Sequence, residues 1–377
     1  MGRKTIKKDE PKTLPIPPEQ LLLELGKDLI PLVDKGKGAE LLERIQNMRR
    51  SIFFDMGIVL PKIRIVDNTL LDSSEYCLKI STVDAGRSTL RMGCYLCINP
   101  GTAVGKVDGE ETKDPAFGLP ALWIAEGKRD EAEQAGYTVA DHCGIMCTHL
   151  TEIIKRRAAE LLGRQEIQGI IDSVKEDYPA VVNELLATGI TLGSVRKVMQ
   201  GLLKERVSIR NTVGILEAIA DSCLSSGDIH FLVERVRQAL ASQICSQYAD
   251  KDRTIHVLTL EPSLEQKIIG SQAQGVSGNI LAALEPELHK AWIQAAEKAV
   301  RTVHEQGHVP VILCPSQARY LVKSTLEREL PEAAVLSVSE IHMDYSVVPV
   351  GVIALAQELS KNKSNKKGKT SGKGKEG

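Results

Sequence analysis

Two cysteines in the sequence have the Cys-x-x-Cys spacing that can bind zinc or carry out thiol–disulfide exchange. Cys94 and Cys97 have this spacing in the segment "CYLC". A second group of candidate ligands follows in "HCGIMCTH" and comprises His142, Cys143, Cys147 and His149. One hypothesis is therefore a thiol or zinc protein that uses the four cysteines of these two segments.

The sequence around the pair argues against that chemistry. "STLRMGCYLCI" reads as a β-strand, in which side chains three positions apart point to opposite faces and cannot bind one ion. A redox-active pair would precede a helix, whose dipole lowers the pKa of the thiol, whereas Ile-Asn-Pro-Gly follows here. We predict that Cys94 and Cys97 are free thiols packed as small hydrophobic side chains, with no metal and no cofactor.

A phosphate-binding loop is the next candidate, suggested by Gly101, Gly105 and Lys106. A Walker loop needs one more residue between the glycines and a Ser or Thr after the lysine, to hold Mg²⁺. Val107 occupies that last position, and an Asp-Gly turn signal follows. The segment does not predict a nucleotide site.

No other enzyme signature is present. The eight histidines are scattered, without a His-Glu-x-x-His or Gly-x-Ser-x-Gly pattern, so we predict no catalytic residues and no enzyme activity. The acidic residues have the spacing of solvated helix faces. The formal net charge of -1, without a strongly basic folded segment, gives no electrostatic case for nucleic acid as a partner.

The sequence predicts a soluble chain. Its longest apolar run, residues 347–356, is too short for a membrane helix, and no apolar secretory signal opens the sequence. The eight cysteines therefore indicate reduced thiols in a cytosol. At the ends, we predict an extended linker over residues 1–19 and a disordered Lys-rich tail over 357–377.

Between the ends, the periodicity changes three times. A helical pattern ends at Gly57, and strands are predicted in 62–68, 75–83 and 88–98. A small insertion with its own strand and helix follows. From Thr148, a candidate helix N-cap, to Tyr248 the pattern is helical, and strands then alternate with helices.

The fold class predicted is α/β with several subdomains: a small mixed α/β domain with an inserted subdomain, a helical domain and a C-terminal α/β domain. The predicted limits are 20–92 with 142–161 for subdomain 1, 93–141 for the inserted subdomain 2, 162–248 for the helical subdomain 3 and 249–356 for subdomain 4.

Several ordered segments together resemble one known family. They are "INPGTAVG", "DPAFGLPALWI", "GYTVAD", "THLTEIIKRRAAELLGRQE", "LLKERVSIRNTVGILEAIAD" and "LVERVRQAL". This series is similar to the cytoplasmic domain of the FlhA/SctV family of type III export gate proteins, over residues 20–340. "DPAFGLPALWI" favours the flagellar branch over the injectisome branch.

The resemblance implies a four-subdomain cytoplasmic part with the second subdomain inserted into the first. It implies membrane helices before the linker, a location at the cytoplasmic face of the bacterial inner membrane, and a ring of nine subunits. Partners would be export chaperone–substrate complexes, the export ATPase complex and the other membrane proteins of the gate.

The resemblance also implies a binding dimple between the first two subdomains. Matching the family's motifs to this sequence assigns the dimple to Asp114, Phe117 and Thr148. The same match places Ile98, Pro100 and Leu119 in its hydrophobic floor. An exposed Phe with aliphatic neighbours suits the apolar stripe of a partner helix, with Asp114 fixing the register. The plain alternative is that Phe117 is core, that Asp-Pro is a turn and that Thr148 is only a helix cap.

Overall fold

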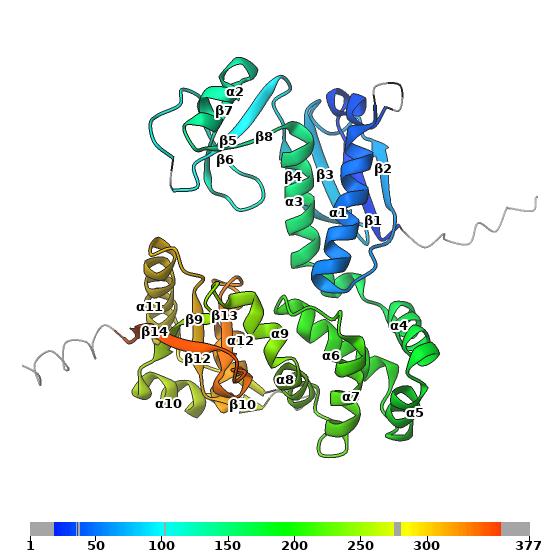
Figure 1. Cartoon of the computed structure of the whole chain (residues 1–377), viewed down its shortest axis with the longest axis vertical. Helices are drawn as coiled ribbons and strands as arrows, with labels where there is room; N and C mark the ends of the chain where they lie inside the picture. Colours follow the sequence, from blue (N-terminus) through cyan, green and yellow to red (C-terminus); the bar gives the residue numbers. More distant parts are fainter. Residues whose placement is uncertain (1–18, 35, 37, 102, 275–279, 356–377) are drawn as a thin grey trace, which may run out of the picture. The chain divides into compact units, whose positions relative to one another are not determined.

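The computed structural model describes residues 19–34, 36, 38–101, 103–274 and 280–355 (Figure 1). The predictions for residues 1–18 and for the tail lie outside these ranges. The chain forms two compact units, Met1–Leu161 and Leu162–Gly377. No helix within the described ranges is both long and apolar enough to cross a membrane.

The first unit contains a four-stranded sheet in the order β2-β1-β3-β4, in which β1 is parallel to β2 and antiparallel to β3. Its elements are β1 (Leu21–Leu25), η1 (Lys27–Val33), α1 (Glu40–Met56), β2 (Ile63–Asp67), β3 (Glu75–Ile80), β4 (Val83–Thr89) and α3 (His142–Arg156). Helices α1 and α3 pack side by side on this sheet (Figure 1). The predicted end of α1 is confirmed: Gly57 has φ 77° and its N–H donates to the Phe53 carbonyl.

Between β4 and α3 the chain builds a second sheet in the order β6-β7-β5-β8, with all neighbours antiparallel. Its elements are β5 (Cys94–Ile98), β6 (Glu110–Lys113), β7 (Pro120–Ala125), η3 (Glu126–Lys128), α2 (Arg129–Gln134) and β8 (Thr138–Ala140). Cys97, Val107, Ile124 and Ala132 form its small core. The excursion lies within the range that we predicted as the inserted subdomain.

Two strand predictions in this unit were wrong in their limits. The predicted strand 75–83 is a hairpin whose two turn residues, Ser81 and Thr82, have φ 48° and 77°. Such turns usually contain Asn or Gly, so this pair gave no signal. The predicted strand 88–98 is interrupted between β4 and β5, where Gly93 has φ 80°.

The second unit opens with helices only, as the periodicity predicted. They are α4 (Arg164–Asp177), α5 (Pro179–Ala187), α6 (Leu192–Lys204), α7 (Thr212–Cys223), α8 (Ile229–Ala239) and α9 (Ala241–Tyr248). The short η4 (Ala158–Leu161) before them ends the first unit. The starts of three of them are fixed by side chains: Thr191, Asn211 and Asp228 each accept a backbone N–H from the first turn.

A parallel sheet follows, in the order β13-β12-β9-β14. Its elements, with a separate two-stranded ribbon β10–β11, are β9 (Thr254–Leu260), α10 (Pro262–Gly270), β10 (Gln272–Gln274), β11 (Ile280–Ala282), α11 (Pro286–Glu305), β12 (Val311–Cys314), α12 (Ser316–Leu326), β13 (Ala334–Ser337), η5 (Val338–Glu340) and β14 (Ser346–Ile353). Pro349 is compatible with β14 because this is an edge strand, and the register shifts next to it. The predicted fold class is thus confirmed.

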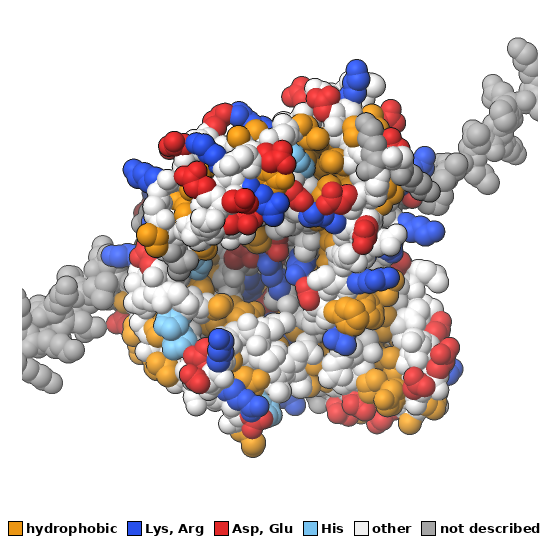
Figure 2. All heavy atoms as spheres, turned by 45° about the horizontal axis from the view of Figure 1, so that its top comes forward, with side chains coloured by type: hydrophobic (Ala, Val, Ile, Leu, Met, Phe, Trp, Pro, Cys, Tyr) orange, Lys and Arg blue, Asp and Glu red, His pale blue; other side chains and the backbone are white. Residues whose placement is uncertain are grey.

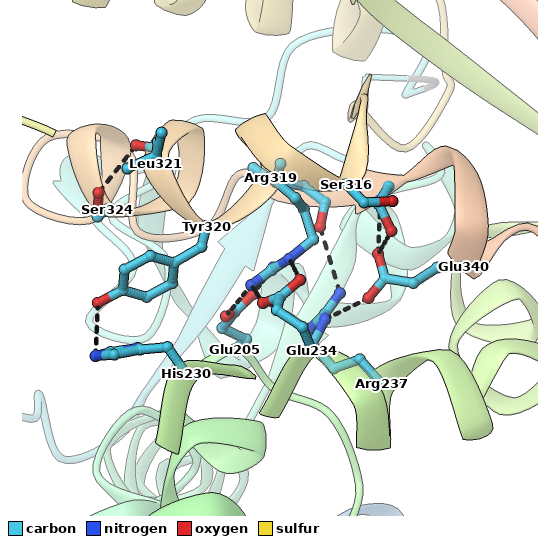
Figure 3. A network of polar contacts seen from close by, with 12 residues as sticks. Glu205, His230, Glu234, Arg237, Ser316, Arg319, Tyr320, Leu321, Ser324 and Glu340 are labelled. Atoms are coloured by element: carbon cyan, nitrogen blue, oxygen red, sulfur yellow. Dashed lines mark hydrogen bonds and ion pairs between the residues drawn. The ribbon is translucent and has the colours of Figure 1, made fainter. Parts of the chain in front are cut away.

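A buried ionic group, here called the arginine cluster, joins the helices of the second unit to its sheet (Figure 3). It consists of Glu205, Glu234, Arg237, Arg319 and Glu340. Arg319 is fully buried; its Nε lies 2.6 Å from Glu234 Oε2 and its Nη1 lies 2.6 Å from Glu205 Oε2. The prediction that the acidic residues form solvated faces is therefore wrong for Glu205 and Glu340.

Candidate functional site

The turn between β6 and β7, residues 114–119, holds three of the six predicted site residues. Asp114 is buried, and its carboxylate accepts the N–H of Phe117 at 2.7 Å. Its backbone N–H donates to Leu119 O and its carbonyl accepts the Gly118 N–H, both at 2.8 Å. Asp114 thus shapes the turn from inside. A contact of its carboxylate with a partner's polar group is not available in this geometry without opening the turn.

The turn exposes two large apolar side chains. Figure 2 shows hydrophobic side chains, coloured orange, at many places on the face that it draws. Phe117 is 54% exposed and Leu119 is 45% exposed, so Phe117 is not a core residue. Ile98, the last residue of β5, is half-buried and pairs with Ala121 of β7, and the exposed Pro100 follows it. These four residues therefore share one end of the second sheet, where Phe117, Leu119 and Pro100 present apolar surface to solvent.

Thr148, the remaining site residue, is exposed in the middle of α3. The prediction that it caps the helix is wrong. Asp141 is the N-cap, because its carboxylate accepts the Gly144 N–H at 2.7 Å and pairs with Arg44. The apolar face of "HCGIMC", with Cys143 and Met146 buried, extends the helix to His142.

The turn and α3 are neighbours. Arg156, in the last turn of α3, donates to the Ala116 carbonyl at 3.4 Å. Burial lowers the pKa of His149 of α3, and the negative charge of Asp114 partly offsets this. No hydrogen bond in the described part of the chain joins Thr148 to residues 114–119. The structure thus brings Asp114, Phe117, Leu119, Ile98 and Pro100 together, and it places Thr148 on the adjoining helix.

A buried polar pair that the sequence did not reveal lies beneath α3. The Tyr76 hydroxyl is 2.8 Å from His149 Nδ1, and both side chains are buried. Burial lowers the pKa of His149, which favours the neutral ring as an acceptor for the Tyr76 hydroxyl. A Cβ on Gly86 of β4 would lie 2.5 Å from the Ile153 Cδ1 atom, so this glycine permits the close packing of α3. In the sequence, the one sign of this close packing is the glycine within "DAGRST".

The cysteines behave as apolar side chains. Cys97 is buried in the core of the second sheet, and Cys94 is half-buried in the same strand. Cys143 and Cys147 lie one turn apart on α3, where burial raises the pKa of their thiols to about 11 and about 12. A thiol with so high a pKa is a poor nucleophile and metal ligand at neutral pH. In the described residues no three His, Cys, Asp or Glu side chains are arranged to hold an ion.

Cys97→Ser is expected to lower the free energy of unfolding by about 1–3 kcal/mol, because a hydroxyl replaces a buried hydrophobic group. Cys94→Ser, at a half-buried position, should cost less than about 0.5 kcal/mol. Urea unfolding and metal analysis of both variants and the wild type test this. Stoichiometric zinc in the wild type that either substitution removes would contradict it.

Comparison with known proteins adds to this geometry. Residues 3–346 match the FHIPEP family. The "Flagellar biosynthesis protein FlhA" of Treponema pallidum is 43% identical over 91% of this chain and 48% of its own length, and that of Bacillus subtilis is 39% identical over 88% and 49%. The chain thus spans about half the length of these curated relatives.

Solved structures share the fold. The Chlamydia pneumoniae CdsV protein superposes with a TM-score of 0.79 at 25% identity, covering 92% of this chain and all of the other. The nonameric SctV-C of EPEC has a TM-score of 0.73 at 23% identity, covering 89% of this chain and 98% of the other, which supports the fold alone. The family resemblance predicted from the ordered motifs is confirmed: the chain belongs to the FHIPEP family.

Proposed function

We propose that this chain is the cytoplasmic part of a type III export gate of the flagellar kind, and that it docks export chaperone–substrate complexes. The observation that carries the docking proposal is the exposure of Phe117 and Leu119 on a turn that Asp114 holds in one conformation. An apolar pair on a rigid turn loses little conformational entropy on binding.

The partner element that fits is an amphipathic helix. Phe117 would insert into its apolar stripe, while Leu119, Ile98 and Pro100 would cover the sides of that stripe. Thr148, exposed on the adjoining α3, would supply a hydroxyl at the edge. Asp114 would act through the shape of the turn, which revises the direct role in register that the sequence suggested.

The wider setting is part of the same proposal. In it, the chain works at the cytoplasmic face of the bacterial inner membrane, next to the export ATPase complex and the other membrane proteins of the gate. The proposal takes its ring of nine subunits from the nonameric SctV-C of EPEC, which shares the fold, and its bound partner protein from the solved complex of the Chlamydia pneumoniae CdsV and CdsO proteins. The subdomain limits given above also remain a proposal.

Identity with curated relatives favours the flagellar branch over the injectisome branch. The curated flagellar sequences reach 43% identity, against 25% for the Chlamydia pneumoniae CdsV structure. The raised pKa of the Cys143 and Cys147 thiols weighs against the alternative of a thiol or zinc protein. The function proposed is non-enzymatic.

Phe117→Ala is expected to weaken binding of a late-substrate chaperone complex by about 2 kcal/mol, or about thirtyfold, because it removes an aromatic anchor from the centre of the interface. Isothermal titration with the cognate complex measures this. The matched control is Leu70→Ala, since Leu70 is 92% exposed in the same unit and lies outside the turn.

Leu70→Ala should leave the affinity unchanged. An equal affinity of Phe117→Ala and wild type, with unchanged circular dichroism spectra, would place the docking site elsewhere. Asp114→Asn gives a further test, because an amide still accepts the Phe117 N–H and should retain binding if the role of Asp114 is to shape the turn.

A further inference from the structure

A second candidate site lies entirely within the second unit. It is a cavity of about 290 Å³ between α6, α8 and α12, here called the lysine cavity. Its lining includes Lys197, Lys204, Glu205, His230, Tyr320 and Lys323. It adjoins the arginine cluster, which supplies Glu205, and Figure 3 shows the Tyr320 hydroxyl directed at His230.

The walls of the cavity are fixed by packing. A Cβ on Gly201 of α6 would lie 2.8 Å from Val233 Cγ2 of α8, so the two helices approach as closely as a glycine allows. Arg319 ties α12 to Glu234 of α8 and to Glu205 at the end of α6. Because the three helices are held together in this way, the cavity exists before any ligand binds.

The cations in this lining have unused hydrogen-bonding capacity. Lys197 and Lys204 lie two turns apart on α6, and neither forms an ion pair or hydrogen bond within the described part of the chain. Lys323 is only 8% exposed and donates to the carbonyls of Pro331 and Ala333, both at 3.0 Å. An ammonium group has three N–H donors, so one remains.

The acidic groups cannot satisfy these cations fully. Both oxygens of Glu205 accept from Arg319, and one accepts from Arg237 as well. Glu327 is exposed at the rim. In the lining itself the cations are Lys197, Lys204 and Lys323 and the acids are Glu205 and Glu327, so the lining holds one more positive than negative charge.

His230 and Tyr320 add two aromatic polar groups to the lining. The rings of His230 and Tyr320 are 4.2 Å apart, and the Tyr320 hydroxyl is 3.4 Å from His230 Nε2. That contact is long for a hydrogen bond that involves a hydroxyl, which leaves the hydroxyl able to turn toward another acceptor. The cavity thus offers several N–H and O–H donors around one space.

We propose that the lysine cavity binds an oxyanion, through Lys197, Lys204 and Lys323, with the Tyr320 hydroxyl as a further donor. The chemistry shared by its ligands is a carboxylate or phosphate group with charge-assisted hydrogen bonds to the ammonium groups. Such a group could be a free small anion or an acidic side chain of a bound peptide. This inference is independent of the docking function of the first unit.

The experiment titrates the whole chain with two probes at constant ionic strength: inorganic phosphate, and the peptide acetyl-hexaglutamate amide, with acetyl-hexaglutamine amide as its neutral counterpart. Isothermal titration should show saturable binding of at least one anionic probe at one site per chain. In the double variant Lys197→Gln, Lys204→Gln the affinity should fall at least about tenfold, since two charge-assisted hydrogen-bond donors are removed.

The matched control is Lys290→Gln, Lys298→Gln, which removes two lysines from α11 of the same unit and should leave the affinity unchanged. Binding of phosphate alone identifies a free anion as the ligand, and binding of hexaglutamate alone identifies an acidic peptide. Equal loss in both double variants, or no saturable binding of either anion, would overturn the proposal.

Discussion

Arg319→Ala is expected to lower the free energy of unfolding of the second unit by about 3–5 kcal/mol, because it leaves buried carboxylates without their cation. The fully buried guanidinium of Arg319 is bound to both Glu205 and Glu234. Arg319→Lys should give an intermediate loss, since an ammonium keeps the charge but cannot form the same paired hydrogen bonds. The control is Arg328→Ala, whose side chain is 93% exposed.

The two tryptophans make this measurable, because Trp123 lies in the first unit and Trp292 in the second. In a Trp123→Phe background, fluorescence during urea unfolding reports on the second unit alone. Arg328→Ala should change its unfolding free energy by less than about 0.5 kcal/mol. An Arg319→Ala variant as stable as this control would mean that the arginine cluster does not hold the unit together.

The arginine cluster should also make stability depend on pH. Burial alone would raise the pKa of Glu205, but the charges of Arg319 and Arg237 outweigh it and lower the pKa to about 2. Its contribution is therefore complete above the unfolded pKa of about 4.3 and is lost as the pH falls toward 2. Burial raises the pKa of Glu234, so its effect has the opposite sign: stability rises as the pH falls from this raised pKa to the unfolded value, above the range in which the contribution of Glu205 is lost.

Trp292→Ala is the second change with a large expected effect, about 3–5 kcal/mol, because it opens a cavity in the core of the C-terminal sheet. The Trp292 side chain is fully buried among residues such as Leu264, Ile312 and Leu321. Its indole N–H donates to Thr325 Oγ1 at 3.0 Å. Thermal unfolding followed by circular dichroism measures the loss.

Trp292→Phe separates packing from the hydrogen bond. It fills most of the space and removes only the indole donor, while the Thr325 hydroxyl still donates to Val322 O at 2.8 Å. We expect it to recover more than half of the stability lost in Trp292→Ala. If the two variants were equally unstable, the hydrogen bond rather than the packing would be the main contribution.

Periodicity revealed most elements of the fold, because helix faces and alternating strands leave local patterns. It located the helical segment and the βα alternation after it, and it placed the end of α1 at Gly57. It missed the Ser81-Thr82 turn, where the conformation is imposed by pairing of β3 with β4 rather than by residue type. It also misplaced the start of α3, because Thr148 has the residue type of a cap but Asp141 has the geometry.

For the candidate site, the motif resemblance supplied the residues and the structure supplied their orientation. No local pattern distinguishes an Asp that faces a partner from one that turns inward, as Asp114 does. The arginine cluster was invisible for a similar reason. Glu205, at the end of α6, and Arg319, on α12, are 114 residues apart in the sequence and come together only in the folded unit.

The position of β14 in the C-terminal sheet bears on how the chain folds as it is made. β9 lies in the interior of the sheet, and its pairing partner β14 is the last strand described, with Ser346 opposite Thr254. Contacts between residues so distant in sequence slow folding, because a long loop must close before they form. During synthesis the first unit can be complete while the second still lacks a strand. Until β14 emerges, one edge of β9 stays unpaired, and that interval is when the nascent chain is most open to wrong pairing.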